Sequence, residues 1–179
     1  MKPLLLPLLL ALTLPVAARA DDALGTLNPD EMSLERSMRE AVEGNTSMTV
    51  CASGYLMTKS GQHGMARSVF ENCAADGWTR AMTWMSYLED NGYGAPMDPD
   101  AAAEYDRLAA ESGDPVGMFN YGLDMLRGHG TALDEEEGRR LIDRAAALGL
   151  ADARRLQGAG YDPDEVTPDA DNWKYAPLY

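Results

Sequence analysis

The chain has 179 residues, and its 15 lysines and arginines stand against 29 aspartates and glutamates, which gives a formal net charge of −14. This length allows one domain with tails. The negative charge excludes nucleic acid and anionic membrane surfaces as primary partners, since both attract positive charge. A basic protein partner fits the charge, and so does a simple need for solubility.

Residues 1–20 have the organisation of a secretory signal peptide. Lys2 gives a positive start, an apolar run covers residues 4–16, and Ala18-Arg19-Ala20 has the small-x-small pattern of a cleavage site. That run is too short for a membrane-spanning helix, and no later segment has the length that one requires. We therefore expect a periplasmic or secreted protein that is not inserted in the membrane after cleavage.

Residues 21–46 are expected to hold an N-terminal capping helix. It is predicted to begin at Asn28-Pro29-Asp30-Glu31 and to end at Gly44. Stacked repeats need such an element because a terminal unit leaves one face uncovered.

A repeat with an offset of thirty-six residues organises residues 47–160. Small residues fall into the same columns at this offset, which is typical of stacked structural units. The clearest columns are Gly77, Gly113 and Gly149; Ala81, Gly117 and Ala153; and Ser86, Gly122 and Gly158.

Each unit is predicted to be a pair of antiparallel helices. Two helices start at an aspartate N-cap and stop before a glycine that can adopt the left-handed conformation. They run from Asp98 to about Ser112 and from Asp134 to about Leu148. Their partner helices are expected from about Trp78 to Asp90 and from Pro115 to Arg127, each ending at a Gly-x-Gly turn. An earlier unit is shorter by four residues around Ser60-Gly61.

This pattern resembles the Sel-one-like (Sel1-like) repeat family, a relative of the tetratricopeptide repeat. The resemblance covers about residues 47–158 and implies an all-α solenoid, a right-handed stack of antiparallel helix pairs that serves as a scaffold for protein binding. The matching positions are Gly77, Ala81, Ser86, Gly92, Gly94, Asp98, Ala109-Ala110 and Gly113, and then Gly117, Gly122, Gly128, Gly130, Asp134, Ala145-Ala146 and Gly149.

Cys51 and Cys73 are the only cysteines in the chain. Pairing is the default in an exported protein, and the repeat register puts the two residues at similar heights on the two helices of the first unit. We therefore predict a disulfide. The alternative is two buried free thiols that act as small apolar residues.

A partner-binding surface is predicted on the side of the helices away from the small-residue columns. Trp84 and Tyr87 share one helix face there, and Asn120 and Leu123 are their equivalents in the next unit. Exposed aromatic residues on that side would act as a binding hot spot. The alternative is that Trp84 packs on the neighbouring unit.

Catalytic and metal chemistry find no support in the sequence. His63 and His129 are the only histidines and fall in predicted turns, and Lys59-Ser60-Gly61 has no Ser-x-x-Lys motif to complete a penicillin-reactive site. We therefore predict a protein that is not an enzyme, with no cofactor and no metal. An envelope hydrolase is the alternative of another class.

The tail, residues 161–179, is acidic and contains four aromatic residues, Tyr161, Trp173, Tyr175 and Tyr179. We expect it to fold back over the last hairpin or into the concave groove of the stacked helix pairs. Together, these sequence features predict a periplasmic repeat protein that binds another protein, as a scaffold or regulator of envelope proteins. An immunity protein that neutralises a secreted toxin is the second binding role considered.

Overall fold

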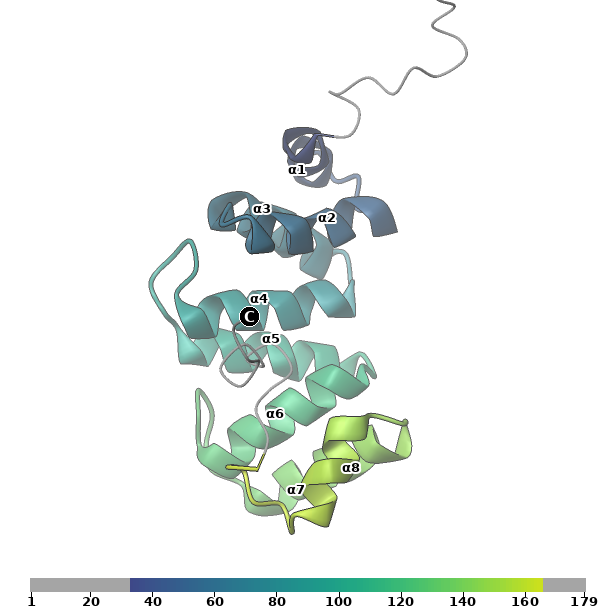
Figure 1. The fold of residues 1–179 in the computed structure, drawn as a ribbon, viewed down its shortest axis with the longest axis vertical. Helices are drawn as coiled ribbons and strands as arrows, with labels where there is room; N and C mark the ends of the chain where they lie inside the picture. The colour runs from purple at the N-terminus through teal and green to yellow at the C-terminus, as the bar shows by residue number, and fades with distance from the viewer. Residues whose placement is uncertain (1–32, 166–179) are drawn as a thin grey trace, which may run out of the picture.

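The computed structural model describes residues 33–165. The predicted signal peptide and the tail from residue 166 onward lie outside the described residues. Within residues 33–165 the chain forms helices and no strands, so the predicted all-α class is confirmed. The helices stack in sequence order from α1 at one end to α7 and α8 at the other (Figure 1).

Within the described residues the stack consists of a first helix, three successive antiparallel pairs and a short last helix. The helices are α1 (Leu34–Val42), α2 (Met48–Lys59), α3 (His63–Ala75), α4 (Thr79–Asn91), α5 (Pro99–Glu111), α6 (Pro115–Arg127), α7 (Glu135–Ala147) and α8 (Ala151–Gly158).

The helix ends follow from the capping residues that the sequence predicts. The side chain of Asp98 accepts the Ala101 N–H at 3.1 Å, and that of Asp134 accepts the Glu137 N–H at 3.1 Å. Both aspartates thereby satisfy a backbone donor that a helix start leaves without an intrahelical partner. The predicted bounds of α4, α5, α6 and α7 are therefore confirmed to within a residue.

The first described helix starts later than the sequence predicts. Ser33 is extended, with φ −76° and ψ 145°, and its side chain accepts the Arg36 N–H at 3.1 Å, so α1 begins at Leu34. The predicted start at Asn28 lies outside the described residues, and the helix that ends before Gly44 begins after the Ser33 N-cap. α1 packs against α2 and α3.

Pairs of complementary residues set the distance between the two helices of each unit. A Cβ on Gly54 would lie 2.5 Å from Cε1 of Phe70, and one on Gly122 would lie 2.9 Å from Cγ1 of Ile142. A large side chain on the second helix therefore rests directly on the backbone of the first. In the middle unit Ser86 is equivalent to the two glycines and Asp106 to the two large residues. These two side chains are joined by a hydrogen bond of 2.5 Å.

The Gly-x-Gly turns fix how one unit sits on the previous one. Gly94 approaches the start of α3, and Gly130 approaches the start of α5. A Cβ on Gly130 would lie 1.9 Å from the carbonyl oxygen of Pro99, where no side-chain atom fits. The turns are therefore contact points between units, not only connections within them.

We expect Gly130→Ala to destabilise the stack more than Gly113→Ala. Both glycines have a positive φ, 62° and 88° respectively, so each alanine costs about 1–2 kcal/mol of backbone strain. Only Gly130 also meets backbone atoms, whereas the Cβ position of Gly113 has no neighbour within 4 Å. Urea denaturation of the two variants measures the difference, and equal losses of stability would contradict the turn contact.

The predicted disulfide is present. Cys51 on α2 and Cys73 on α3 are bonded, and their Cα atoms are 5.9 Å apart. The bond ties together the helices of the unit that has the shortened turn. The free-thiol alternative was wrong because the register brings the two cysteines face to face across the hairpin.

Removal of the disulfide should cost about 3 kcal/mol, because the bond closes a loop with a sequence separation of 22 residues. For a domain of this size that corresponds to a fall of roughly 10 °C in Tm. Thermal unfolding with and without reductant tests this, and the Cys51→Ser/Cys73→Ser double variant is the control. Reductant should lower the Tm of the native chain and leave that of the variant unchanged. Equal Tm values for the native chain in both conditions would refute the stabilising role.

Candidate functional site

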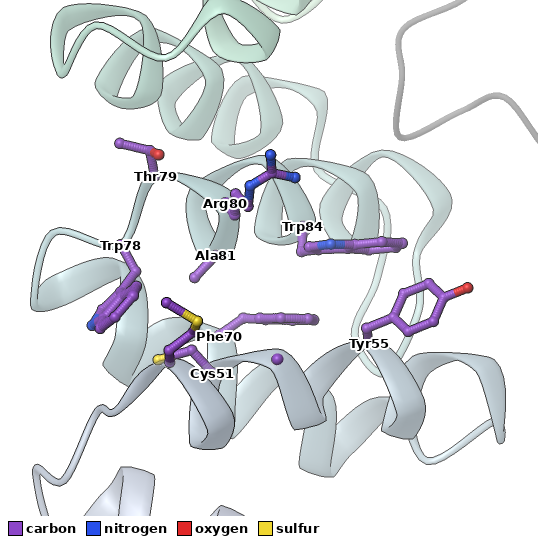
Figure 2. Close-up of a pocket in the computed structure, with 10 residues that line it drawn as sticks. Cys51, Tyr55, Phe70, Trp78, Thr79, Arg80, Ala81 and Trp84 are labelled. Carbon is purple, nitrogen blue, oxygen red and sulfur yellow. The ribbon is translucent and has the colours of Figure 1, made fainter.

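An apolar pocket of about 540 Å³ opens between α2 and α4. A volume of this order is typical of pockets that receive a ligand or a large side chain. Figure 2 shows its two walls, with Tyr55 and Cys51 on the α2 side and Trp84, Ala81 and Trp78 on the α4 side. The lining residues are Met48, Cys51, Ala52, Tyr55, Phe70, Trp78, Thr79, Arg80, Ala81 and Trp84.

On the α2 side the pocket borders an apolar stripe that faces solvent. Met48, Tyr55 and Leu56 are exposed by 73%, 43% and 56% respectively. Together with Ala52 they have the i, i+4, i+7, i+8 spacing of one helix face. The opposite side of α2 packs into the core through Val50 and Met57. α2 is therefore apolar on two sides, and only one of them is covered by the described residues.

Trp84 is the central aromatic residue of the pocket. Its ring is stacked on Phe70, with centroids 5.9 Å apart and an interplanar angle of 7°, and it meets Tyr55 edge-on at 5.4 Å. The rings of Trp84 and Phe70 lie parallel in Figure 2, with Tyr55 beside them. The indole is half-buried, so it both packs on the first unit and presents a face to the pocket. The two interpretations of Trp84, as a binding residue and as a residue that packs on the neighbouring unit, are thus compatible.

The other three predicted binding residues are not on the surface. Tyr87 is 7% exposed, and Asn120 and Leu123 are fully buried, so the expectation that they line an open surface was wrong. Tyr87 is covered because the Gly92–Gly94 turn brings Tyr93 onto it, with ring centroids 5.6 Å apart. Asn120 turns inward because its amide donates to Asp106, and Leu123 packs in the core shared by α6 and α7.

The two histidines take part in contacts between units. His63 is the first residue of α3 and stacks on Tyr93 with centroids 4.5 Å apart. His129 lies in the Gly128–Gly130 turn, at the position equivalent to Tyr93. Its Nε2 lies 2.8 Å from a carboxylate oxygen of Asp90. Their predicted position at turns is right for His129, whereas His63 is half-buried and packed, because the Gly92–Gly94 turn lies against it.

A buried polar cluster in the middle unit is the other chemical feature of note. Asp106 is 2% exposed, accepts from Ser86 at 2.5 Å and accepts from Asn120 at 3.2 Å. Burial raises the pKa of Asp106 well above its usual value; the two hydrogen bonds oppose this and the nearby Asp90 and Asp114 add to it. The cluster is closed to solvent, so it is a structural pairing and not a site that a substrate could reach.

Residues 33–165 contain neither a metal-binding cluster nor a membrane-spanning helix. In that range no group of histidine, cysteine, aspartate and glutamate side chains is arranged to hold a metal ion. None of the helices there has the length and apolar character needed to cross a bilayer.

The first residues of the predicted tail lie against the last hairpin. The hydroxyl of Tyr161 donates to Asp143 at 2.5 Å, and the guanidinium of Arg139 lies 5.5 Å from the Tyr161 ring centroid. Arg155 and Glu165 form an ion pair at 3.0 Å. The expectation of folding back thus fits residues 161–165, and the rest of the tail lies outside the described residues.

Helix pairs stacked through small-residue columns define an all-α repeat protein. Neither a protein-family model nor a curated protein sequence matches the chain. Solved structures do: a Sel1 repeat protein from Oxalobacter formigenes has a TM-score of 0.63 and 19% identity over 79% of this chain and 60% of that one. Helicobacter pylori cysteine rich protein B has a TM-score of 0.56 and 21% identity over 73% and 96% of the two chains.

A third similar structure is c5321, a protective antigen of uropathogenic Escherichia coli strains described as displaying an SLR fold. It has a TM-score of 0.51 and 18% identity, over 80% of this chain and 37% of that one. At these identities the likeness establishes a shared fold. The chain therefore has the Sel1-like repeat fold that its glycine columns predict, and it spans 60% of the length of the Oxalobacter protein.

Asp106→Asn should stabilise the protein at neutral pH. The raised pKa of Asp106 means that its stabilising contribution is present below the unfolded pKa of about 3.9 and is lost as the pH rises through the folded value. The asparagine is neutral at every pH and can bond both Ser86 and Asn120. Its advantage over the native chain should therefore be largest at neutral pH and shrink toward about pH 4.

Urea denaturation at both pH values measures this advantage. Asp106→Ala is the matched control: it also removes the titrating carboxyl but leaves Ser86 and Asn120 without an acceptor, so it should be less stable than Asp106→Asn by about 1–3 kcal/mol at both pH values. A lower stability of Asp106→Asn at neutral pH would contradict the buried-acid interpretation.

Proposed function

We propose that this chain is a periplasmic, non-enzymatic repeat protein that binds another protein, as a scaffold or regulator of envelope proteins. The pocket between α2 and α4 is the proposed site. The observation that carries the proposal is the exposed apolar stripe of α2 facing Trp84 across an open cavity. Exposed apolar surface of this kind is characteristic of interaction sites.

The architecture of the pocket favours a protein ligand. Its walls come from two different units, and the disulfide and the aromatic stacking hold both walls in place. A surface that is already rigid loses little conformational entropy on binding, which favours affinity. Trp and Tyr are also the residues that most often dominate binding energy at protein interfaces.

The proposed compartment has two independent supports. Residues 1–20 have a signal-peptide pattern, and the Cys51–Cys73 bond is typical of proteins that fold in an oxidising environment. The non-enzymatic role is supported by the character of the pocket, whose lining is mainly aromatic and aliphatic and contains no carboxylate or histidine among the described residues.

Trp84→Ala should weaken partner binding roughly 30-fold, the effect of losing an aromatic hot-spot residue. Capture from an envelope extract identifies the partner, and calorimetric titration of the purified pair measures the change in affinity. Because Trp84 also packs on Phe70, Tyr55→Ala provides a second pocket variant with less effect on the core.

Leu133→Ala is the matched control, since Leu133 is 62% exposed in the turn before α7, away from the pocket. Far-UV circular dichroism checks that all variants keep their helices. Full affinity in both Trp84→Ala and Tyr55→Ala would remove this pocket from the proposed site.

A further inference from the structure

The pocket carries a local charge that is opposite to that of the whole chain. Among the described residues that line it, Arg80 is the only charged one, although acidic residues outnumber basic ones by 29 to 15 in the sequence. Nζ of Lys59 lies 5.5 Å from the ring centroid of Tyr55, another lining residue. One cation therefore lines the apolar cavity and a second lies on one of its aromatic side chains, in a strongly acidic protein.

Within residues 33–165 neither cation forms an ion pair with a carboxylate. Arg67, Arg107 and Arg140 all form ion pairs, whereas Arg80 and Lys59 form none within residues 33–165. Arg80 is exposed on α4, four residues before Trp84, and Figure 2 shows it beside the indole with its guanidinium turned away from α2. A guanidinium in this position can form two parallel hydrogen bonds with an incoming carboxylate.

Asp114, whose carboxylate contacts the lining residue Thr79, does not pair with Arg80. Asp114 accepts from the hydroxyl of Thr79 at 2.7 Å, and it caps α6 by accepting the N–H groups of Val116 and Gly117 at 2.8 Å and 3.3 Å. Its oxygens are already engaged in holding α4 and α6. The free donors of Arg80 remain available to a ligand.

We propose that the pocket between α2 and α4 binds a segment of a partner protein in which a large apolar side chain stands next to an aspartate or glutamate. The apolar side chain enters the cavity against Trp84, and the carboxylate pairs with Arg80. This inference rests on the proposed function and specifies its partner. It selects an acidic segment, whereas the net charge of the chain alone favours a basic partner.

The probe is a random peptide display library, selected on the intact chain and counter-selected on the Trp84→Ala variant. Selected peptides should carry Asp or Glu beside an aromatic or branched aliphatic residue. Arg80→Glu should weaken their binding roughly tenfold, as expected for the loss and reversal of a contact charge pair. Replacing the acidic residue of the peptide by lysine should restore binding to Arg80→Glu and weaken binding to the native chain.

Arg144→Glu is the matched control. Arg144 is exposed on α7 and, like Arg80, forms no ion pair with the described residues, so its reversal changes the net charge equally while leaving the pocket intact. Binding of the selected peptides should be unaffected by it. Circular dichroism of Arg80→Glu should match that of the native chain because the side chain lies outside the core.

The outcomes separate this inference from the proposed function. Peptides that depend on Trp84 but bind Arg80→Glu as tightly as the native chain, or that carry lysine or arginine in place of the acid, overturn the acidic-segment proposal and leave the pocket as a binding site. The absence of any Trp84-dependent peptide counts against both. A pocket filled by residues 166–179 or by a second copy would give that same result.

Discussion

Close approach of neighbouring helix backbones sets the geometry of the whole stack. Apolar burial alone would hold the helices together at many distances, since it is not directional. The distance is fixed where a large residue on the second helix of a unit rests on a residue without a side chain, as Phe70 does on Gly54 and Ile142 on Gly122. In the middle unit a shorter pair, Ser86 and Asp106, makes the equivalent contact through a hydrogen bond in place of apolar contact.

This spacing also determines where the pocket lies. The first unit has the shortened turn, and the disulfide holds its two helices together at α2 and α3. Small residues, Cys51 and Ala52, then stand on α2 where it faces α4, so the two walls do not close on each other. Between α4 and α6, the equivalent helices one unit later, Phe119 is fully buried and the two helices pack against each other. The pocket is thus a consequence of which side chains the first unit lacks.

The sequence predicts the fold far better than the site, and the residues show why. Helix ends depend on local signals such as Asp98, Asp134 and the glycines at left-handed positions, and these are legible in the chain. The exposure of a side chain depends on what folds over it. Tyr87 and Trp84 lie three residues apart on one helix, yet the turn carrying Tyr93 covers only Tyr87. Tyr55 and Ala52 could have been found, because the shortened first unit places them in the columns of Tyr87 and Trp84.

For polar residues too, the sequence does not predict which side chains are buried and which can bind a partner. Asn120 stands in the column of Trp84, and only the structure reveals that Asp106, from another helix, draws its amide into the core. The sequence, with a net charge of −14, likewise does not identify Arg80 as a binding residue. Net charge is a sum over the whole surface, whereas binding depends on local patches of charge. Contact electrostatics act within a few ångströms, and charges beyond about 8 Å are screened at physiological salt. An acidic protein can therefore present a basic contact to an acidic partner, provided that the cation stands beside the apolar surface that gives the affinity, as Arg80 stands beside Trp84.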